Sequence, residues 1–225
     1  MMIVAHRGAS AYEPENTLRA IEKAIELGAN MVEVDVRPSK DGHIVVIHDD
    51  SVDRTTNGEG YVKNMTLKEL KKLDAGIGER VPTLQEVIGA VRRRVVLVIE
   101  IKVLNFEEAV VRTVEKEGME KEVMITSFYH PVLERVKKID SIIKTGVIFK
   151  CHPIRSAELA LNARADVLFP EYKYTSKEMV EEARKSNLEI YPWTVDDQAL
   201  ADRFIKMGVN GIVTNKPDIL KSRKQ

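Results

Sequence analysis

Short runs of apolar, often β-branched residues recur along the chain, and each is followed by a segment whose apolar positions have helical spacing. Unbroken apolar runs are typical of strands buried on both faces of a parallel sheet. They predict eight strands, at Met2–Ala5, Met31–Val36, Val95–Ile101, Glu122–Thr126, Ile143–Phe149, Asp166–Pro170, Leu188–Trp193 and Gly211–Thr214. Amphipathic segments predict helices between the strands, among them Thr17–Leu27, Leu84–Arg92, Phe106–Lys116, Ser176–Lys185 and Asp197–Met207.

The spacing of the predicted strands indicates the fold. They begin at residues 2, 31, 95, 122, 143, 166, 188 and 211. Eight strand–helix units predict an α/β fold, a TIM (β/α)8 barrel, with a doubly wound open sheet as the alternative because spacing alone does not show closure. The interval of 64 residues between 31 and 95 predicts a small insertion after the second strand, at 37–80, within one domain spanning 1–225. Because this insertion follows the carboxyl end of a strand, we expect it over the barrel mouth.

The composition excludes several classes of protein. Hydrophobic residues make up 44% and charged residues 31% of the 225 residues, so the chain can bury a core and is not disordered. Basic and acidic residues number 35 each, so no overall charge attracts nucleic acid or an anionic membrane. The single cysteine, Cys151, excludes an internal disulfide and a cysteine metal cluster. The lack of a signal-peptide pattern and of a long apolar stretch predicts a cytoplasmic protein without membrane insertion.

Charged residues end strands that should otherwise be apolar. Glu33 and Asp35 share one face of the second strand, and Glu100 and Lys102 share one face of the third. Three carboxylates directed at one point repel each other unless a cation lies between them. Glu33, Asp35 and Glu100 therefore predict a divalent metal site, and oxygen ligands favour Mg²⁺ or Ca²⁺. Ion pairs of these acids with Lys102 and Arg7 are the alternative.

The remaining polar strand ends suggest a site for a phosphate ester. Arg7 and Lys102 form a cationic pocket suited to phosphate. His6 and His48 are candidates for an acid/base pair, because imidazole titrates near neutral pH. Two further strand ends carry possible substrate contacts, Glu171 and Trp193. Trp193 either walls the pocket against the carbon skeleton of a substrate or packs structurally.

Recognisable motifs follow one another along almost the whole chain. They are His6-Arg7-Gly8, Glu13–Thr17, Glu33–Val36, Asp41-Gly42, Val46–Asp49, Asp53–Gly58, Pro82–Leu84, Ile99–Lys102, Trp193-Thr194 and Gly211–Pro217. In number and order these motifs resemble the glycerophosphodiester phosphodiesterase family. The resemblance implies a TIM barrel with a small insertion after the second strand, in agreement with the long interval between the second and third strands.

The resemblance also implies an activity and residue roles. Members of the family hydrolyse glycerophosphodiesters, small-molecule substrates, to glycerol 3-phosphate and an alcohol. The roles carried over are acid/base catalysis by His6 and His48, metal binding by Glu33, Asp35 and Glu100, and phosphate contacts by Arg7 and Lys102. Glu15 and Asn16 lie near the site by the same resemblance, although Asn16 could instead cap the first helix. The chain departs from the family at Asn215, where many members have Asp, and we expect position 215 to be structural.

Other functions remain open at this point. Related barrel phosphodiesterases act on lysophospholipids or inositol phospholipids, although the short insertion favours a small, water-soluble substrate. Lys102 could form a Schiff base in a barrel aldolase, but neighbouring carboxylates should keep it protonated. A phosphoester-binding barrel without catalysis is disfavoured by the two histidines. The sequence leaves open which histidine is the acid, and whether water or the glycerol 2-hydroxyl is the nucleophile.

Overall fold

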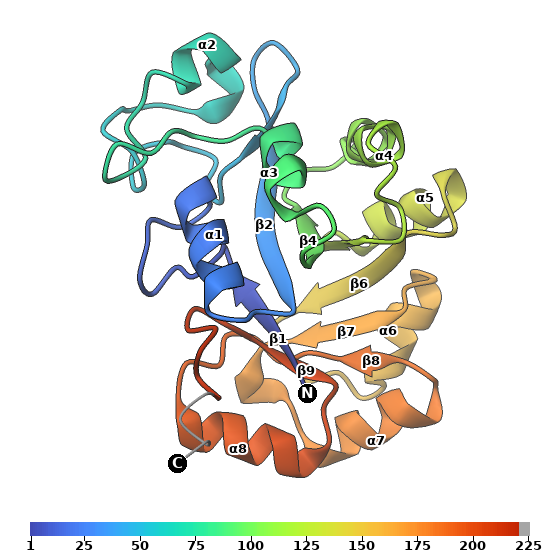
Figure 1. The fold of residues 1–225 in the computed structure, drawn as a ribbon. Coiled ribbons are helices and arrows are strands. Elements are labelled where there is room, and N and C mark those ends of the chain that lie inside the picture. The colour runs from blue at the N-terminus through green and yellow to red at the C-terminus, as the bar shows by residue number, and fades with distance from the viewer. Residues whose placement is uncertain (221–225) are drawn as a thin grey trace.

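Eight parallel strands curve into a nearly closed barrel with helices around its outside (Figure 1). The computed structural model describes residues 1–220, so the last five residues of the predicted domain, 221–225, lie outside the described part. The barrel strands are β1 (Met2–His6), β2 (Met31–Pro38), β4 (Val96–Ile101), β5 (Val123–Ser127), β6 (Lys144–Phe149), β7 (Val167–Pro170), β8 (Glu189–Ile190) and β9 (Gly211–Thr214). The predicted TIM barrel is confirmed.

The two ends of the sheet come together. Hydrogen-bonded neighbours follow the order β8-β7-β6-β5-β4-β2-β1-β9. Between the outermost strands, the backbone N–H of Asn210 donates to the carbonyl of Ile190 at 3.1 Å, and that of Val213 donates to Pro192 at 2.9 Å. These bonds link β9 to the chain at β8, so the doubly wound open sheet is excluded.

The helices cover the outer face of the barrel and bury their apolar sides against it (Figure 1). Thr17 caps the first of them by accepting a hydrogen bond from the N–H of Ala20, and Thr83 forms a capping box with Glu86. The helices are α1 (Leu18–Glu26), α3 (Leu84–Val91), α4 (Glu107–Lys116), α5 (His130–Ile139), α6 (Ser156–Asn162), α7 (Lys177–Lys185) and α8 (Gln198–Met207), with a short 3₁₀ turn, η2 (Tyr172–Tyr174), before α7. Among residues 1–220, no helix combines the length and apolar character needed to cross a membrane.

Side chains inside the barrel form two layers. An apolar layer is made by residues of the strands: Val4, Met31, Val98, Met124, Ile148, Phe169, Tyr191 and Val213. Because side chains alternate between the faces of a strand, the residue two positions later projects inward again, nearer the carboxyl end. At the eight strands these residues are His6, Glu33, Glu100, Thr126, Lys150, Glu171, Trp193 and Asn215. The mouth of the barrel is therefore polar although the strands beneath it are apolar.

The insertion after β2 forms a small body with its own apolar cluster, visible at the upper left of Figure 1. Its strand β3 (Ile44–Val46) pairs antiparallel with the end of β2, and it continues through the 3₁₀ turn η1 (Val62–Asn64) and the short helix α2 (Leu67–Leu70). The buried residues of this cluster are Val45, Ile47, Val52, Val62, Leu70, Ala75 and Val81.

Candidate active site

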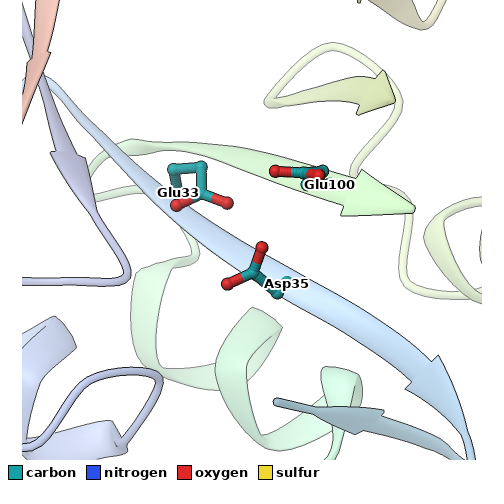
Figure 2. A group of neighbouring side chains, drawn as sticks. All are labelled: Glu33, Asp35 and Glu100. Atoms are coloured by element: carbon teal, nitrogen blue, oxygen red, sulfur yellow. The ribbon is translucent and has the colours of Figure 1, made fainter. Parts of the chain in front are cut away.

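Three carboxylates from two adjacent strands point toward one another at the mouth (Figure 2). The register of β2 and β4 places Asp35 beside Glu100, and Glu33 lies two residues earlier on the same face as Asp35. One oxygen of each carboxylate lies within 4.8 Å of the others, and all three residues are buried. Glu33 Oε1 accepts no hydrogen bond from any described residue. The metal ligands expected from the sequence thus come together.

The burial of these acids changes their protonation. Burial, with the charges of Asp35 and Glu100, raises the pKa of Glu33 well above its usual value. Burial and the charge of Asp35 likewise raise the pKa of Glu100 to about 7. Asp35 behaves differently, because Lys102 and Arg7 outweigh the effect of burial and lower its pKa to about 2. A cation shared by the three carboxylates would favour their ionised forms. The all-oxygen donor set and the unpartnered Glu33 oxygen fit Mg²⁺ or Ca²⁺.

Two cations lie against the carboxylate cluster. Lys102 Nζ is 2.5 Å from Glu100 Oε1 and 3.0 Å from Asp35 Oδ1, and Arg7 Nε is 3.3 Å from Asp35 Oδ2. The ion pairs considered as an alternative to a metal site are therefore present. These pairs engage Asp35 and Glu100 and leave Glu33 Oε1 without a partner among the described residues, so the pairs and a metal site are compatible. Burial would lower the pKa of Lys102, but Asp35 and Glu100 outweigh it and raise that pKa, which disfavours a Schiff-base role.

The local backbone turns Arg7 toward the acids. Arg7 has a left-handed conformation, with φ of 57°, and its N–H donates to Glu33 Oε2 at 2.9 Å. Gly8 follows with φ of 82°, and a Cβ there would lie 2.6 Å from the carbonyl carbon of Ala20. Only glycine permits this close approach of the loop to α1. Asn16 donates to Asp35 Oδ2 at 2.8 Å, so it contacts the site, while the neighbouring Thr17 caps the helix.

A cavity of about 360 Å³ opens at the mouth. Its charged side carries His6, Arg7, Glu33, His48, Glu100 and Lys102, and the largely apolar part of its wall is formed by Val98, Thr126, Phe128, Ile148, Phe169, Trp193 and Val213. Trp193 donates through Nε1 to the carbonyl of Phe169 at 2.8 Å and meets Phe128 edge to face. Glu171 is not among the lining residues; its Oε2 is 3.6 Å from Nζ of Lys150, which does line the cavity.

His6 has a polar partner that we did not expect. Its Nδ1 lies 2.8 Å from Oδ1 of Asn215, and Nδ2 of Asn215 donates to Asp196. Burial, with the charge of Arg7, lowers the pKa of His6 to about 4. Position 215, which we expected to be structural, thus contacts a candidate catalytic side chain. The alternation contained the signal, because Asn215 follows Val213 by two residues as His6 follows Val4.

His48 is held by a chain of ion pairs that starts in the insertion. Its Nδ1 is 2.5 Å from Asp49 Oδ1, and Arg54 donates through Nε to Asp49 Oδ2 at 2.6 Å. Arg54 also donates through both Nη atoms to Glu15 at 2.8 Å, and Glu15 accepts from Arg7 at 2.8 Å. Burial lowers the pKa of His48. Sequence spacing does not reveal this chain, because its members lie up to 47 residues apart, from Arg7 to Arg54.

Known proteins share this sequence pattern and fold. The sequence profile of the glycerophosphoryl diester phosphodiesterase family matches residues 6–219. A glycerophosphodiester phosphodiesterase of Caldanaerobacter subterraneus subsp. tengcongensis is 45% identical over 97% of this chain and 96% of its own length. The crystal structure of a glycerophosphodiester phosphodiesterase from Agrobacterium tumefaciens aligns with a TM-score of 0.88 at 31% identity, covering 99% of both chains.

A second solved structure contains a bound molecule. An Oleispira antarctica phosphodiesterase, in complex with the product sn-glycerol-3-phosphate, aligns with a TM-score of 0.91 at 27% identity over 99% of this chain and 96% of that one. The family profile covers nearly the whole barrel, and the first relative matches it end to end. The chain therefore belongs to the glycerophosphoryl diester phosphodiesterase family.

Proposed function

We propose that this phosphoric diester hydrolase cleaves glycerophosphodiesters to glycerol 3-phosphate and an alcohol in a metal-dependent reaction. The observation that carries the proposal is a single cavity lined by two histidines, two cations and two acids, Glu33 and Glu100, of a carboxylate cluster suited to a divalent ion. The Oleispira antarctica relative, whose structure contains sn-glycerol-3-phosphate, supports the choice of product.

The charged side of the cavity binds the phosphate in this proposal. Glu33, Asp35 and Glu100 would hold Mg²⁺ or Ca²⁺, which when bound polarises a phosphoryl oxygen. Arg7 and Lys102 line the same side and contact the non-bridging oxygens. Because these cations are already fixed by ion pairs with buried carboxylates, they stabilise negative charge that develops in the transition state without reorganising.

The two histidines move the protons. One takes a proton from the attacking hydroxyl, and the other donates a proton to the departing alkoxide. The apolar wall with Trp193 contacts the carbon skeleton of the substrate, and Glu171, beside Lys150 at the edge of the cavity, contacts polar groups of the alcohol.

We also propose that residues 1–225 act as one domain, in which the subregion 37–80 supplies His48 to the mouth. The single tryptophan, Trp193, reports on the mouth by fluorescence, and far-UV circular dichroism reports on the whole barrel. One coincident unfolding transition by both probes is expected. Cytoplasmic localisation is a proposal from the sequence pattern, and cell fractionation with an antibody tests it.

The decisive experiment is a coupled assay of glycerol 3-phosphate release. The substrates are glycerophosphocholine, glycerophosphoethanolamine, glycerophosphoglycerol and lysophosphatidylcholine, each with and without chelator and with Mg²⁺ or Ca²⁺ restored. Release from the glycerophosphodiesters that chelator abolishes and metal restores is expected. Turnover confined to the lysophospholipid would support the alternative substrate class, and turnover resistant to chelator would overturn the metal-dependent mechanism.

A further inference from the structure

Asp196 fixes the orientation of the Asn215 side chain. Its carboxylate accepts hydrogen bonds from Thr214 Oγ1 at 2.9 Å, from the backbone N–H of Asn215 at 2.7 Å, and from Asn215 Nδ2 at 2.5 Å. An ionised carboxylate can only accept hydrogen bonds, so the amide nitrogen of Asn215 has to face Asp196. The amide oxygen therefore points the other way.

The oriented amide oxygen determines which nitrogen of His6 carries the proton. Asn215 Oδ1 lies 2.8 Å from His6 Nδ1 and 2.8 Å from Ser10 Oγ. Because an amide oxygen only accepts, Nδ1 of His6 carries the hydrogen. A neutral imidazole has a single N–H, so the lone pair then lies on Nε2. Nε2 accepts no hydrogen bond from residues 1–220, and His6 lines the cavity.

The second histidine has a different kind of partner. Nδ1 of His48 faces the carboxylate of Asp49, whereas Nδ1 of His6 faces a neutral amide. A carboxylate stabilises an imidazolium, and an amide oxygen does so much less. The two histidines of the cavity are therefore distinguished by the charge of the group behind each ring.

We propose that Asn215, oriented by Asp196, is a positioning residue that holds His6 in the Nδ1–H tautomer with Nε2 free to accept the proton of the attacking hydroxyl. The inference rests on the proposed function. As the new P–O bond forms, that proton moves to Nε2 of His6. His48 enters the step as an imidazolium whose Nδ1–H faces Asp49, and its Nε2 proton moves to the alkoxide when the P–O bond to the alcohol breaks. His6 gains the one proton that His48 loses, and exchange with solvent restores both rings.

Three variants separate positioning from packing. Asn215→Leu removes the acceptor at similar volume, and Asp196→Asn allows the amide of residue 215 to face either way. The double variant Asn215→Asp, Asp196→Asn restores an acceptor toward His6 and a donor toward residue 215. We expect kcat to fall on the order of 10²-fold in Asn215→Leu with KM changed less than about threefold, and to recover in the double variant. Asn162→Leu, at the exposed end of α6, is the matched control.

The tautomer is read directly by NMR. The chain has five histidines, so the side-chain ¹⁵N signals of histidine-labelled protein can be assigned with a His6→Gln variant. In the presence of Mg²⁺ or Ca²⁺, we expect His6 of the unaltered protein to show a protonated Nδ1 and an unprotonated Nε2. Asp196→Asn should give a mixture of tautomers, and Asn162→Leu should leave the signals unchanged.

The outcomes divide cleanly. An Nε2–H tautomer of His6 in the unaltered protein, an unchanged kcat in Asn215→Leu, or an unchanged tautomer in Asp196→Asn would each overturn the proposal. A fall in kcat together with a lower Tm, and no recovery of either in the double variant, would assign these residues to packing and would also reject the proposal. Because NMR needs no turnover, a protein that releases no glycerol 3-phosphate would refute the proposed function while leaving the tautomer measurable.

Discussion

Among residues 1–220, one buried oxygen of Glu33 has no hydrogen-bond partner, in a cluster whose other members are paired with Lys102 and Arg7. The pKa of Glu33 is raised well above the usual value by burial, so in the absence of metal burial favours the protonated, neutral form of the side chain. A neutral amide can replace a neutral acid at little cost to the metal-free fold. The same replacement removes a ligand charge from the proposed metal site.

Glu33→Gln should therefore separate folding from metal binding. We expect the free energy of unfolding without metal to change by less than about 1 kcal/mol. A bound ion at 100 times its Kd stabilises the unaltered protein by about 2.7 kcal/mol, and the variant should lose this gain. Urea unfolding with chelator and with added Mg²⁺ or Ca²⁺ measures both quantities. Glu59→Gln, at an exposed position of the insertion, is the control. If added metal stabilised Glu33→Gln as much as the unaltered protein, the ligand assignment would be contradicted.

The buried imidazole of His6 couples stability to pH. Burial and Arg7 lower its pKa to about 4, against 6.5 in an unfolded chain. Below pH 6.5 the unfolded state binds a proton at His6 that the folded state does not bind. The contribution of His6 to the free energy of unfolding is therefore fully present above pH 6.5 and is lost as the pH falls toward 4. Relative to His6→Asn, the free energy of unfolding should fall by up to about 3 kcal/mol across this range. Urea titrations in chelator from pH 4 to 8 test this, and a difference between the two proteins that is independent of pH would refute it.

At the level of elements, the insertion contributes a side chain to the cavity. It brings His48 to the cavity, and Arg54 connects it to the loop after β1 through Asp49 and Glu15. The apolar cluster of the insertion is separate from the core between the barrel strands and the outer helices. Ile44 and Val46 anchor the insertion to that outer core, and Arg54 adds an ion-pair link to the loop after β1.

Arg54→Met should reduce activity with little loss of stability. The Arg54 side chain is 48% exposed, so its ion pairs contribute at most about 1 kcal/mol to folding. Because His48 loses the support of a fixed Asp49, we expect kcat to fall by roughly tenfold. Hydrogen exchange should increase within the insertion and stay constant in the barrel strands. Arg112→Met removes a comparable ion pair on α4 and should leave kcat unchanged; equal kcat in both variants would count against the role of Arg54.

At the scale of the whole molecule, large side chains fill the interior of the barrel, and a glycine makes room for one of them. Gly146 on β6 leaves room for the ring of Phe169, which forms part of the cavity wall. A Cβ at position 146 would lie 2.5 Å from Cε2 of Phe169 and 3.3 Å from Thr126. The glycine is thus required by packing across the barrel, which local sequence does not reveal.

Gly146→Ala should destabilise the protein by about 1–3 kcal/mol, because the ring of Phe169 has to move within a packed interior. Gly89→Ala is a matched comparison: Gly89 lies on the exposed face of α3, and a Cβ added there would have no other atom within 4 Å. This substitution should stabilise the helix by up to about 1 kcal/mol. Urea unfolding of the two variants measures both expected changes in the free energy of unfolding, a decrease for Gly146→Ala and an increase for Gly89→Ala. Equal effects would show that barrel packing does not constrain position 146.

Periodicity along the chain determined much of this protein by itself. Apolar runs at regular spacing predict the strands, the long interval predicts the insertion, and the two-residue alternation predicts that Glu33, Asp35 and Glu100 share the mouth. These features are local, because the pleat of a strand fixes the face on which each side chain lies. The family motifs added the expected roles of His6 and His48.

Tertiary structure alone decided which side chains contact one another at the mouth. The bond between His6 and Asn215 joins the first and last strands of the barrel, and the direct pairing of β1 with β9 is what brings them together. The ion pairs of Arg54 depend on how the insertion folds back, and the raised pKa of Glu100 depends on burial. Contacts between distant segments and the dielectric around a charge arise from packing of the whole chain, so no local pattern contains them.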